Sequence, residues 1–247
     1  MGRRVEVPAK PKRVISLVPS QSELLHDLGL GDRLVGVTKF CIHPQDLRKA
    51  KTIVGGTKQF RFEAIDALQP DLIIGNKEEN YQEGIHQLAE KYPVWMSDIF
   101  TLEDALDMIR KVSDLCDVPE KGASMATGIR QTFDTLTLQK KGTALYLIWK
   151  GPYMAAGRNT FINEMLNKAG YQNVVGEERY PEVSLESVKD LSPDVIMLSS
   201  EPFPFAEKHK KVLLLAVPEA RIELVDGELM SWYGSRLLKT AEYLKGL

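Results

Sequence analysis

Short apolar runs alternate with helical patterns along residues 13–96 of the chain. The runs are brief, rich in β-branched residues and bounded by proline or polar residues, which predicts strands; they are Arg13–Val18, Leu34–Val37, Asp71–Ile74 and Pro93–Met96. Between them, apolar residues recur at helical spacing, and the predicted helices are Ser20–Leu28, Phe62–Leu68 and Tyr81–Lys91. This alternation predicts an α/β fold with mostly parallel sheets built from βαβ units.

The first predicted helix carries signals at both of its ends. Ser20 and Glu23 have capping-box spacing, so Ser20 is expected to accept a hydrogen bond from the Glu23 amide while the Glu23 side chain accepts one from the Ser20 amide. Gly29 suits the position just after the helix, as Gly170 does after a later one.

The middle of the chain differs, because no segment from Thr101 to about Gln139 predicts a strand. One helix is expected to begin near Thr101 and a second to run over Pro119–Leu138, with Pro119 at its first position. The alternation then resumes. The predicted strands are Thr143–Ile148, Asp194–Leu198 and Ile222–Val225, and the predicted helices are Phe161–Ala169, Leu185–Leu191 and Trp232–Leu244.

The chain also contains an internal repeat. Phe62–Ile74 (FEAIDALQPDLII) matches Leu185–Met197 (LESVKDLSPDVIM) at a constant offset of 123 residues. A second echo, Ser22–Gly29 against Asn163–Gly170, precedes the first in both halves and argues against chance similarity. We therefore predict two similar α/β lobes, residues 1–100 and 141–247, joined by a helical linker at 101–140, with a ligand-binding cleft between them.

Composition narrows the classes of partner. The 247 residues include 32 Lys and Arg against 34 Asp and Glu, a net charge of −2 with a pI of about 6.1, so there is no general attraction to nucleic acid or anionic lipid. The clearest long apolar run, Val212–Val217, is far shorter than the roughly 18 residues of a membrane helix, and we expect no membrane-spanning segment.

The N-terminus shows no signal peptide. Val14–Val18 is the only apolar stretch near it, and Ser16 interrupts this stretch while Pro19 ends it. We expect a cytoplasmic protein if the chain is full length, and a periplasmic or extracellular one if an export signal was removed.

The sequence contains no recognisable catalytic motif. Gly29 and Gly31 are followed by glycine only at position 36, so the dinucleotide fingerprint fails, and no Walker loop, GxSxG or HExxH is found. The four histidines are scattered and suggest no triad. We expect a binding protein with no intrinsic cofactor.

Several motifs occur in a characteristic order. Arg13–Leu25 reads RVISLVPSQSELL and Gly29–Val37 reads GLGDRLVGV; the others are Val54–Gly56, Leu68–Ile74, Tyr180–Glu186 and Ser199–Phe205. Their order and spacing resemble the helical-backbone metal receptors, the substrate-binding proteins of ABC importers for vitamin B12, haem and iron-siderophores. The resemblance covers roughly residues 5–245 and is closest to the cobalamin-binding branch.

The resemblance implies two Rossmann-like lobes bridged by one long helix, expected at Pro119–Leu138. It implies a monomer that captures cobalamin or a related corrinoid, with haem or a ferric siderophore as the alternative ligand, for an ABC importer. A cytoplasmic corrinoid-handling protein or enzyme of the same fold is the other alternative. Acidic residues would dock onto the importer, and the candidates are Glu78, Glu79, Glu83 and Glu207, with Glu201 also considered; a solvated acidic face is the simpler interpretation.

A corrin ring needs aromatic walls and a few polar groups. The candidate ligand contacts lie in predicted loops or at helix starts, and they are Phe40, Phe60, Trp149, Tyr153, Trp232, Tyr233 and Arg158. Trp149 and Tyr153 follow the first strand of the second lobe, the usual position of a site in α/β sheets. The alternative is that the rings cap the lobe cores and that Arg158 is an ordinary surface residue.

The two cysteines, Cys41 and Cys116, are too few for a disulfide framework, and we expect free thiols. Cys41 and His43 lie two residues apart in a predicted loop and could face one metal ion. His43 could also provide an axial nitrogen to cobalt or iron. The alternative is a buried thiol beside a turn histidine.

Overall fold

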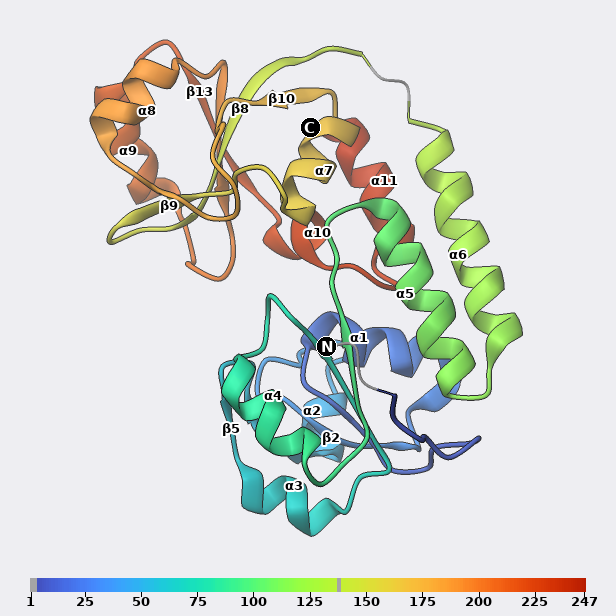
Figure 1. The fold of residues 1–247 in the computed structure, drawn as a ribbon. Helices are drawn as coiled ribbons and strands as arrows, with labels where there is room; N and C mark the ends of the chain where they lie inside the picture. Colours follow the sequence, from blue (N-terminus) through green and yellow to red (C-terminus); the bar gives the residue numbers. More distant parts are fainter. Residues whose placement is uncertain (1–3, 137–138) are drawn as a thin grey trace. The chain divides into compact units, whose positions relative to one another are not determined.

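The computed structural model describes residues 4–136 and 139–247, which divide into two compact units (Figure 1). The first unit contains the described chain up to Ile99 together with Glu103–Arg130 and Tyr233–Arg236. The second contains Phe100–Leu102, the described part of Gln131–Trp232, and Leu237–Leu247.

The main sheet of the first unit is parallel throughout, with strand order β3-β2-β1-β6-β7. Its strands are β1 (Val14–Ser16), β2 (Leu34–Val37), β3 (Thr52–Ile53), β6 (Leu72–Asn76) and β7 (Val94–Ser97). A short antiparallel pair, β4 (Gly55–Gly56) and β5 (Gln59–Phe60), lies outside this sheet. Residues of β1 and β6 are buried because both strands lie inside the sheet, and these residues include the polar Ser16 and Asn76 at the strand ends.

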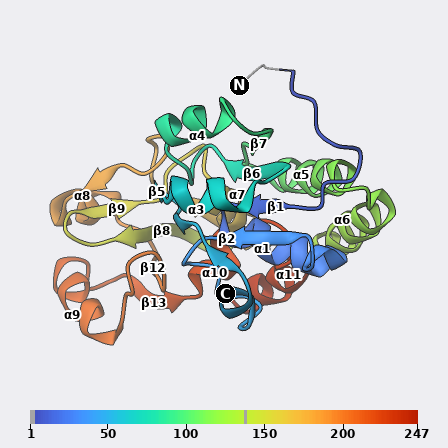
Figure 2. The same cartoon turned by 90° about the horizontal axis from the view of Figure 1, so that it is seen from below.

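Helices cover the sheet of the first unit. They are α1 (Pro19–Leu25), a π-helical turn η1 (His26–Leu30), α2 (Leu47–Ala50), α3 (Phe62–Leu68), α4 (Gln82–Ala89), α5 (Leu102–Leu115) and α6 (Pro119–Asp134). Ile65 of α3 and Leu88 of α4 pack against Ile15 and Ile73 of the sheet. Figures 1 and 2 show α5 and α6 side by side, and they pack so closely that an added Cβ at Gly122 would overlap Ser113 Oγ.

The sheet of the second unit is mixed, with strand order β11-β9-β8-β12-β13 and β10 paired to β8. Its strands are β8 (Gly142–Trp149), β9 (Tyr153–Ala155), β10 (Tyr171–Asn173), β11 (Glu182–Val183), β12 (Val195–Ser199) and β13 (Arg221–Val225). β8, β10, β12 and β13 pair in parallel, whereas β9 runs antiparallel to both β8 and β11. The strands β8, β12 and β13 correspond to those predicted from sequence, whereas β10 was not predicted.

Helices lie on both faces of this second sheet. They are α7 (Phe161–Lys168), α8 (Leu185–Leu191), α9 (Glu207–Ala216), α10 (Gly227–Ser231) and α11 (Leu237–Gly246). Figure 1 shows α8 and α9 on one side of the strands, with α7 and α11 on the other. Val188 and Leu213 join Leu145, Ile196 and Ile222 in one core. The predicted fold class, α/β with two Rossmann-like lobes, is confirmed, and α6 runs from the first unit into the second after Arg130.

The sequence repeat corresponds to a repeated arrangement of hydrogen bonds. The Asp71 carboxylate accepts hydrogen bonds from the backbone amides of Lys12 (2.7 Å) and Arg13 (2.9 Å), which precede β1. The equivalent Asp194 accepts from the Thr143 amide (2.6 Å) and hydroxyl (2.8 Å) at the start of β8. Each aspartate thus joins the start of its own strand to the start of the neighbouring one.

The residues around the two aspartates repeat as well. Gln69 and Ser192, two positions before each aspartate, both have a φ of 43° and end their helices in the left-handed region. The strand registers also match, because Val14 pairs with Leu72 and Ala144 with Val195. The repeat is therefore a duplicated helix–turn–strand unit.

The predicted capping box of the first helix is wrong. Helix α1 begins at Pro19, its N-cap is Val18, and no side chain caps it. The Glu23 carboxylate instead pairs with the Arg236 guanidinium, a charged partner far away in sequence. The predicted glycine end is confirmed at Gly170, which follows α7 with a φ of 92°. Gly29 has a φ of 79° but lies within η1, where it marks a kink between two helical turns.

Two other helix boundaries differ from the prediction. No helix begins at Trp232: α10 ends at Ser231, Trp232 is extended, and α11 begins at Leu237. Gly234, with a φ of 130°, lies in this break and cannot continue a helix. Helix α6 ends at Asp134 rather than at Leu138, a residue that lies outside the described part of the chain.

Within residues 4–136 and 139–247, every helix is too short or too polar to cross a lipid bilayer.

The hydrogen bonds from Thr143 hold the pKa of Asp194 below its usual range. A lowered pKa in the folded state stabilises the protein above the unfolded pKa, and this stability is lost as the pH falls through the folded pKa. We therefore expect Asp194→Asn to unfold at lower urea concentration than the wild type at pH 7, and the difference to shrink as the pH approaches 3. Asp190→Asn, an exposed change on α8, is the control. A difference that does not vary with pH would contradict this role.

Candidate functional site

Buried polar side chains gather where the parallel strands of the first unit end, which we call its carboxyl edge. Ser97, the last residue of β7, accepts hydrogen bonds from Gln21 Nε2 (2.7 Å) and Asn76 Nδ2 (3.0 Å) and lies 3.2 Å from the Gly75 carbonyl. Asn80 Oδ1 accepts from the Asn76 amide at 2.9 Å. These bonds fasten α1 and the loop after β6 to the ends of β6 and β7.

Cys41 belongs to a second chain of buried hydrogen bonds at the same edge. Its thiol donates to Ser22 Oγ (3.1 Å) and lies 3.4 Å from Thr38 Oγ1, while Ser22 Oγ donates to Ser16 Oγ (2.8 Å). Burial raises the pKa of the Cys41 thiol. This environment supports the interpretation of Cys41 as a buried structural thiol. Cys116 is also a free and buried thiol.

Cys41 and His43 were considered as two ligands of one metal ion, and such a site would need further ligands nearby. In the described part of the chain, no group of three or more His, Cys, Asp or Glu side chains could hold a metal ion. His43 lies half-buried in the loop after Cys41. Its use as an axial ligand of a chelated metal stays a prediction.

The two aromatic candidates of the first unit differ in exposure. Phe40 follows β2 and is 49% exposed, with Lys39 Nζ 5.0 Å from its ring centroid. Phe60 of β5 is 6% exposed and packs against Phe62 and Tyr81 in the core. Phe40 therefore has surface to offer a ligand, whereas Phe60 has little.

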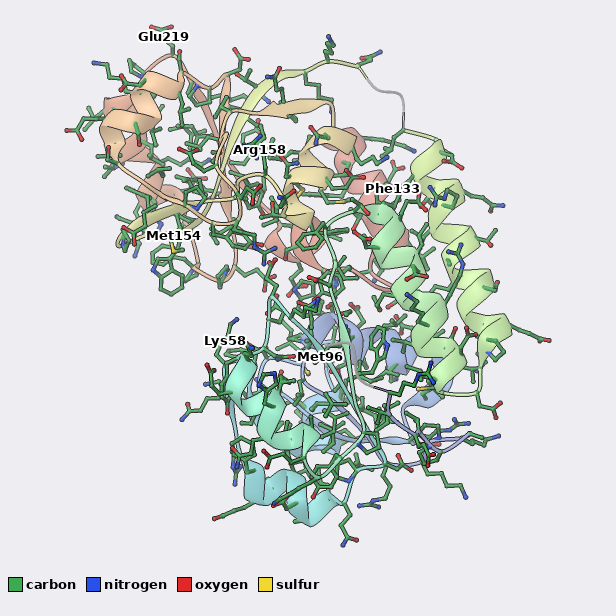
Figure 3. The ribbon with its side chains drawn as sticks, viewed as in Figure 1. Lys58, Met96, Phe133, Met154, Arg158 and Glu219 are labelled. Atoms are coloured by element: carbon green, nitrogen blue, oxygen red, sulfur yellow. The ribbon has the colours of Figure 1, made fainter. Side chains whose placement is uncertain are left out.

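The acidic candidates of the first unit lie in and just after the loop that follows β6. The backbone amides of Glu78 and Glu79 donate to Asn76 Oδ1 at 2.9 and 3.1 Å, and Lys58 Nζ donates to the Glu78 carbonyl; Lys58 is labelled in Figure 3. Both glutamates are half-buried, and Glu83 is exposed in the first turn of α4. The sequence thus presents three carboxylates on one short stretch, and their docking role stays a prediction.

Aromatic side chains gather at the carboxyl edge of the second unit. Trp149, the last residue of β8, is 39% exposed and meets Phe203 edge-on at 5.6 Å. The Phe203 ring also packs edge-on against two other rings, with centroid distances of 4.8 Å to Phe205 and 5.3 Å to His209. Burial lowers the pKa of His209, with the nearby cations of Lys150 and Lys208 acting in the same direction, so His209 is neutral at pH 7. Trp149 therefore packs on a mostly apolar cluster formed by Phe203, Phe205 and the neutral His209.

The remaining candidates of the second unit lie apart from this cluster or at its margin. Tyr153 of β9 is half-buried, and burial raises the pKa of its hydroxyl. Arg158 is exposed after β9 (labelled in Figure 3), where its backbone bonds to Glu177 and Arg179 at 2.7 Å. Glu207 begins α9 and pairs with Lys210 at 2.8 Å.

Trp232 is held by a carboxylate. Its indole Nε1 donates to Glu201 Oε1 at 2.7 Å, and Ser231 Oγ donates to the same oxygen at 3.2 Å. Burial raises the pKa of Glu201, and the Glu228 and Asp226 carboxylates raise it further. Glu201 is therefore engaged with Trp232 and Ser231, which the sequence did not reveal.

The segment after Trp232 belongs to the first unit, where a buried ion pair holds it. Arg236 Nε and Nη2 donate to the two carboxylate oxygens of Glu23, both at 2.9 Å. Both residues are 8% exposed. The two-pronged geometry orients the segment that carries Tyr233, which is itself 6% exposed. The sequence does not reveal that Glu23 and Arg236 form a pair, because they are 213 positions apart in the chain.

The chain has recognisable relatives. The family model described as periplasmic binding protein matches residues 14–214. A vitamin B12-binding protein from Vibrio parahaemolyticus is 30% identical over 195 residues, covering 76% of this chain and 70% of the relative. Another, from Photorhabdus laumondii, is 28% identical over 246 residues, covering 96% of this chain and 87% of the relative.

Solved structures share the fold. A periplasmic vitamin B12-binding protein of Vibrio cholerae superimposes with a TM-score of 0.82 at 25% identity, covering 96% of each chain. A periplasmic haem-binding protein from Pseudomonas aeruginosa has a TM-score of 0.81 at 27% identity, covering 95% of this chain and 91% of its own.

Removing one partner of the Glu23–Arg236 pair leaves a buried charge. We expect Glu23→Ala to lower the free energy of unfolding by about 3–5 kcal/mol, measured by urea denaturation. The double variant Glu23→Met/Arg236→Met should recover most of this loss, because it leaves no unpaired charge in the apolar surroundings. Wild-type stability in the single variant would show that the pair does not hold the segment.

Proposed function

The chain belongs to the periplasmic binding protein family, and from this premise we propose that it captures a corrinoid, foremost cobalamin, for an ABC importer. The family and its named relatives are binding proteins rather than enzymes. The observation that carries the proposal is the similarity to vitamin B12-binding proteins, which extends over 96% of this chain in one case.

The carboxyl edges of the two sheets support this proposal by their chemistry. Phe40 in the first unit and Trp149 in the second keep exposed aromatic surface beside strand ends. The corrin faces are apolar, and aromatic rings bury such surface with little loss of side-chain freedom. Tyr153 and Arg158 are further proposed contacts, and His43 is the proposed nitrogen donor to a chelated metal. Trp232 and Tyr233 stay proposed contacts but are only 8% and 6% exposed, so each offers a ligand a small surface, as does Phe60 at 6%.

Haem is the second candidate ligand. The haem-binding structure from Pseudomonas aeruginosa is 27% identical and shares the fold over 95% of this chain. Arg158 is exposed and could pair with a propionate. Both ligands are flat metal chelates, so the same aromatic side chains suit either.

The second proposed partner, besides the ligand, is an ABC importer, and a role with it implies a location outside the cytoplasmic membrane. Glu78, Glu79 and Glu83 lie on one stretch of the first unit, and Glu207 lies at the start of α9 in the second. Carboxylates at such positions can meet basic residues of a membrane partner and accelerate association.

Ligand capture is tested with purified protein incubated separately with cyanocobalamin and with hemin, each followed by gel filtration. We expect corrin absorbance and cobalt in equimolar amount to elute with the protein, because the aromatic surface removes the ring from water. Retention of hemin without cobalt would select the haem alternative. Elution of the protein without either ligand would overturn the proposal.

Docking is tested by charge reversal. We expect Glu79→Lys and Glu83→Lys to lower importer-dependent uptake of labelled cobalamin in cells by about tenfold, because reversing a charge at an interface costs more than a kilocalorie per mole. The affinity of the purified variants for cyanocobalamin should not change. Glu63→Lys, an exposed change on α3, is the matched control. Loss of ligand affinity in the docking variants would show that these residues are misassigned.

A further inference from the structure

We propose that Glu201 is a positioning residue that fixes the Trp232 indole in the orientation used to bind the ligand. The inference rests on the proposed function for its ligand and on the structure of the second unit for its geometry. Glu201 itself is not proposed to touch the ligand.

The hydrogen bond is short and directed. Trp232 Nε1 has a single N–H to donate, and it donates to Glu201 Oε1 at 2.7 Å. The single proton of the Ser231 hydroxyl has two acceptors within reach, the Gly227 carbonyl at 2.7 Å and the same Glu201 oxygen at 3.2 Å. A charge-assisted bond of this length restrains the rotation of the indole about its side-chain torsions.

Glu201 is suited to this task because its own backbone is fastened. Ser199 Oγ donates to the Glu201 carbonyl and accepts from Tyr146 OH at 3.1 Å inside the core. Ser200 Oγ accepts from the Gly227 amide at 2.9 Å, which ties the loop after β12 to the start of α10. Gly227 is the residue that permits this approach, since an added Cβ would come within 2.6 Å of Glu201 Cγ.

Helix α10, which directly precedes Trp232, is also held in place. Asp226 caps it by accepting from the Leu229 amide at 3.1 Å, and Thr240 of α11 donates to the Leu229 carbonyl at 3.1 Å. Trp232 follows this short helix directly and its amide donates to the Glu228 carbonyl at 2.9 Å. Backbone and side chain of Trp232 are thus both restrained, so the indole is pre-organised before a ligand arrives.

Pre-organisation has a measurable value in binding. Ordering a side chain on association costs about 0.5–1.5 kcal/mol, a cost that is removed when the side chain is already fixed. Glu201 is half-buried, and burial strengthens the hydrogen bond that it accepts. The carboxylate therefore contributes to affinity without contacting the ligand.

The first test follows the indole without any ligand. The sequence has three tryptophans, so a ¹⁵N-labelled sample shows three indole N–H resonances, and Trp232→Phe assigns the one of interest. We expect Glu201→Ala to shift this resonance upfield and to accelerate its exchange with solvent. Glu201→Gln should largely preserve both, because the amide oxygen can still accept the hydrogen bond. A Trp232 resonance unchanged in Glu201→Ala would overturn the inference.

The second test measures affinity for cyanocobalamin, and for hemin if hemin is the ligand retained. We expect Glu201→Ala to raise the Kd about tenfold, which is about 1.4 kcal/mol, and Glu201→Gln to raise it less. Glu219→Ala, an exposed change in the same unit (Figure 3), is the matched control and should bind as the wild type does.

A double-mutant cycle separates positioning from general damage. If Glu201 acts through the indole, Glu201→Ala should cost nothing further in a Trp232→Phe background. Two results would overturn the inference. One is a Glu201→Ala variant with a shifted indole resonance and an unchanged Kd. The other is a Glu201→Ala change that weakens binding equally in the wild-type and Trp232→Phe backgrounds. Wild-type protein that binds neither ligand would instead overturn the proposed function, and the indole resonance would still decide whether Glu201 holds Trp232.

Discussion

Two aspartates hold the strand starts of this protein in register, and the positions of the candidate site residues depend on them. Asp71 bonds to the backbone before β1, and Asp194 bonds to the start of β8. A slip of one residue would turn every side chain of a strand to the opposite face of its sheet. By setting the pairing at one end, each aspartate also sets which residues emerge at the other end, where Ser16 and Asn76 lie in the first unit and Trp149 in the second.

The parallel parts of the two sheets share one topology, but their carboxyl edges differ in chemistry. In the first unit, the polar side chains at the edge bond to one another and hold the loops in place; they are Gln21, Asn76 and Ser97. In the second unit, Trp149 and Phe203 present apolar surface on an aromatic base. The duplicated unit gives both sheets similar parallel strands. The side chains at the strand ends make one carboxyl edge polar and the other aromatic.

The segment between α10 and α11 combines two separate restraints. Trp232 is bonded to Glu201 in the second unit, and Arg236 is bonded to Glu23 in the first. Both bonds involve a carboxylate and a fixed N–H geometry, so both define orientation as well as distance. A binding protein gains affinity from such restraints because less ordering is left to occur when the ligand binds.

Sequence alone determined the α/β class, the duplication, most strands and the glycine end of α7, because these follow from local periodicity and backbone preference. It also placed Trp149 at the carboxyl end of a strand, where the structure has it. It misplaced the start of α1 and predicted a helix at Trp232, where the structure has a break. At α1, the Glu23 carboxylate is bound by the distant Arg236 instead of the Ser20 amide. At Trp232, Gly234 prevents the helix from continuing, and the indole is bound by the distant Glu201. Only the tertiary structure could show these pairs, because a side chain's choice between a local and a distant partner depends on which groups folding brings within hydrogen-bond distance.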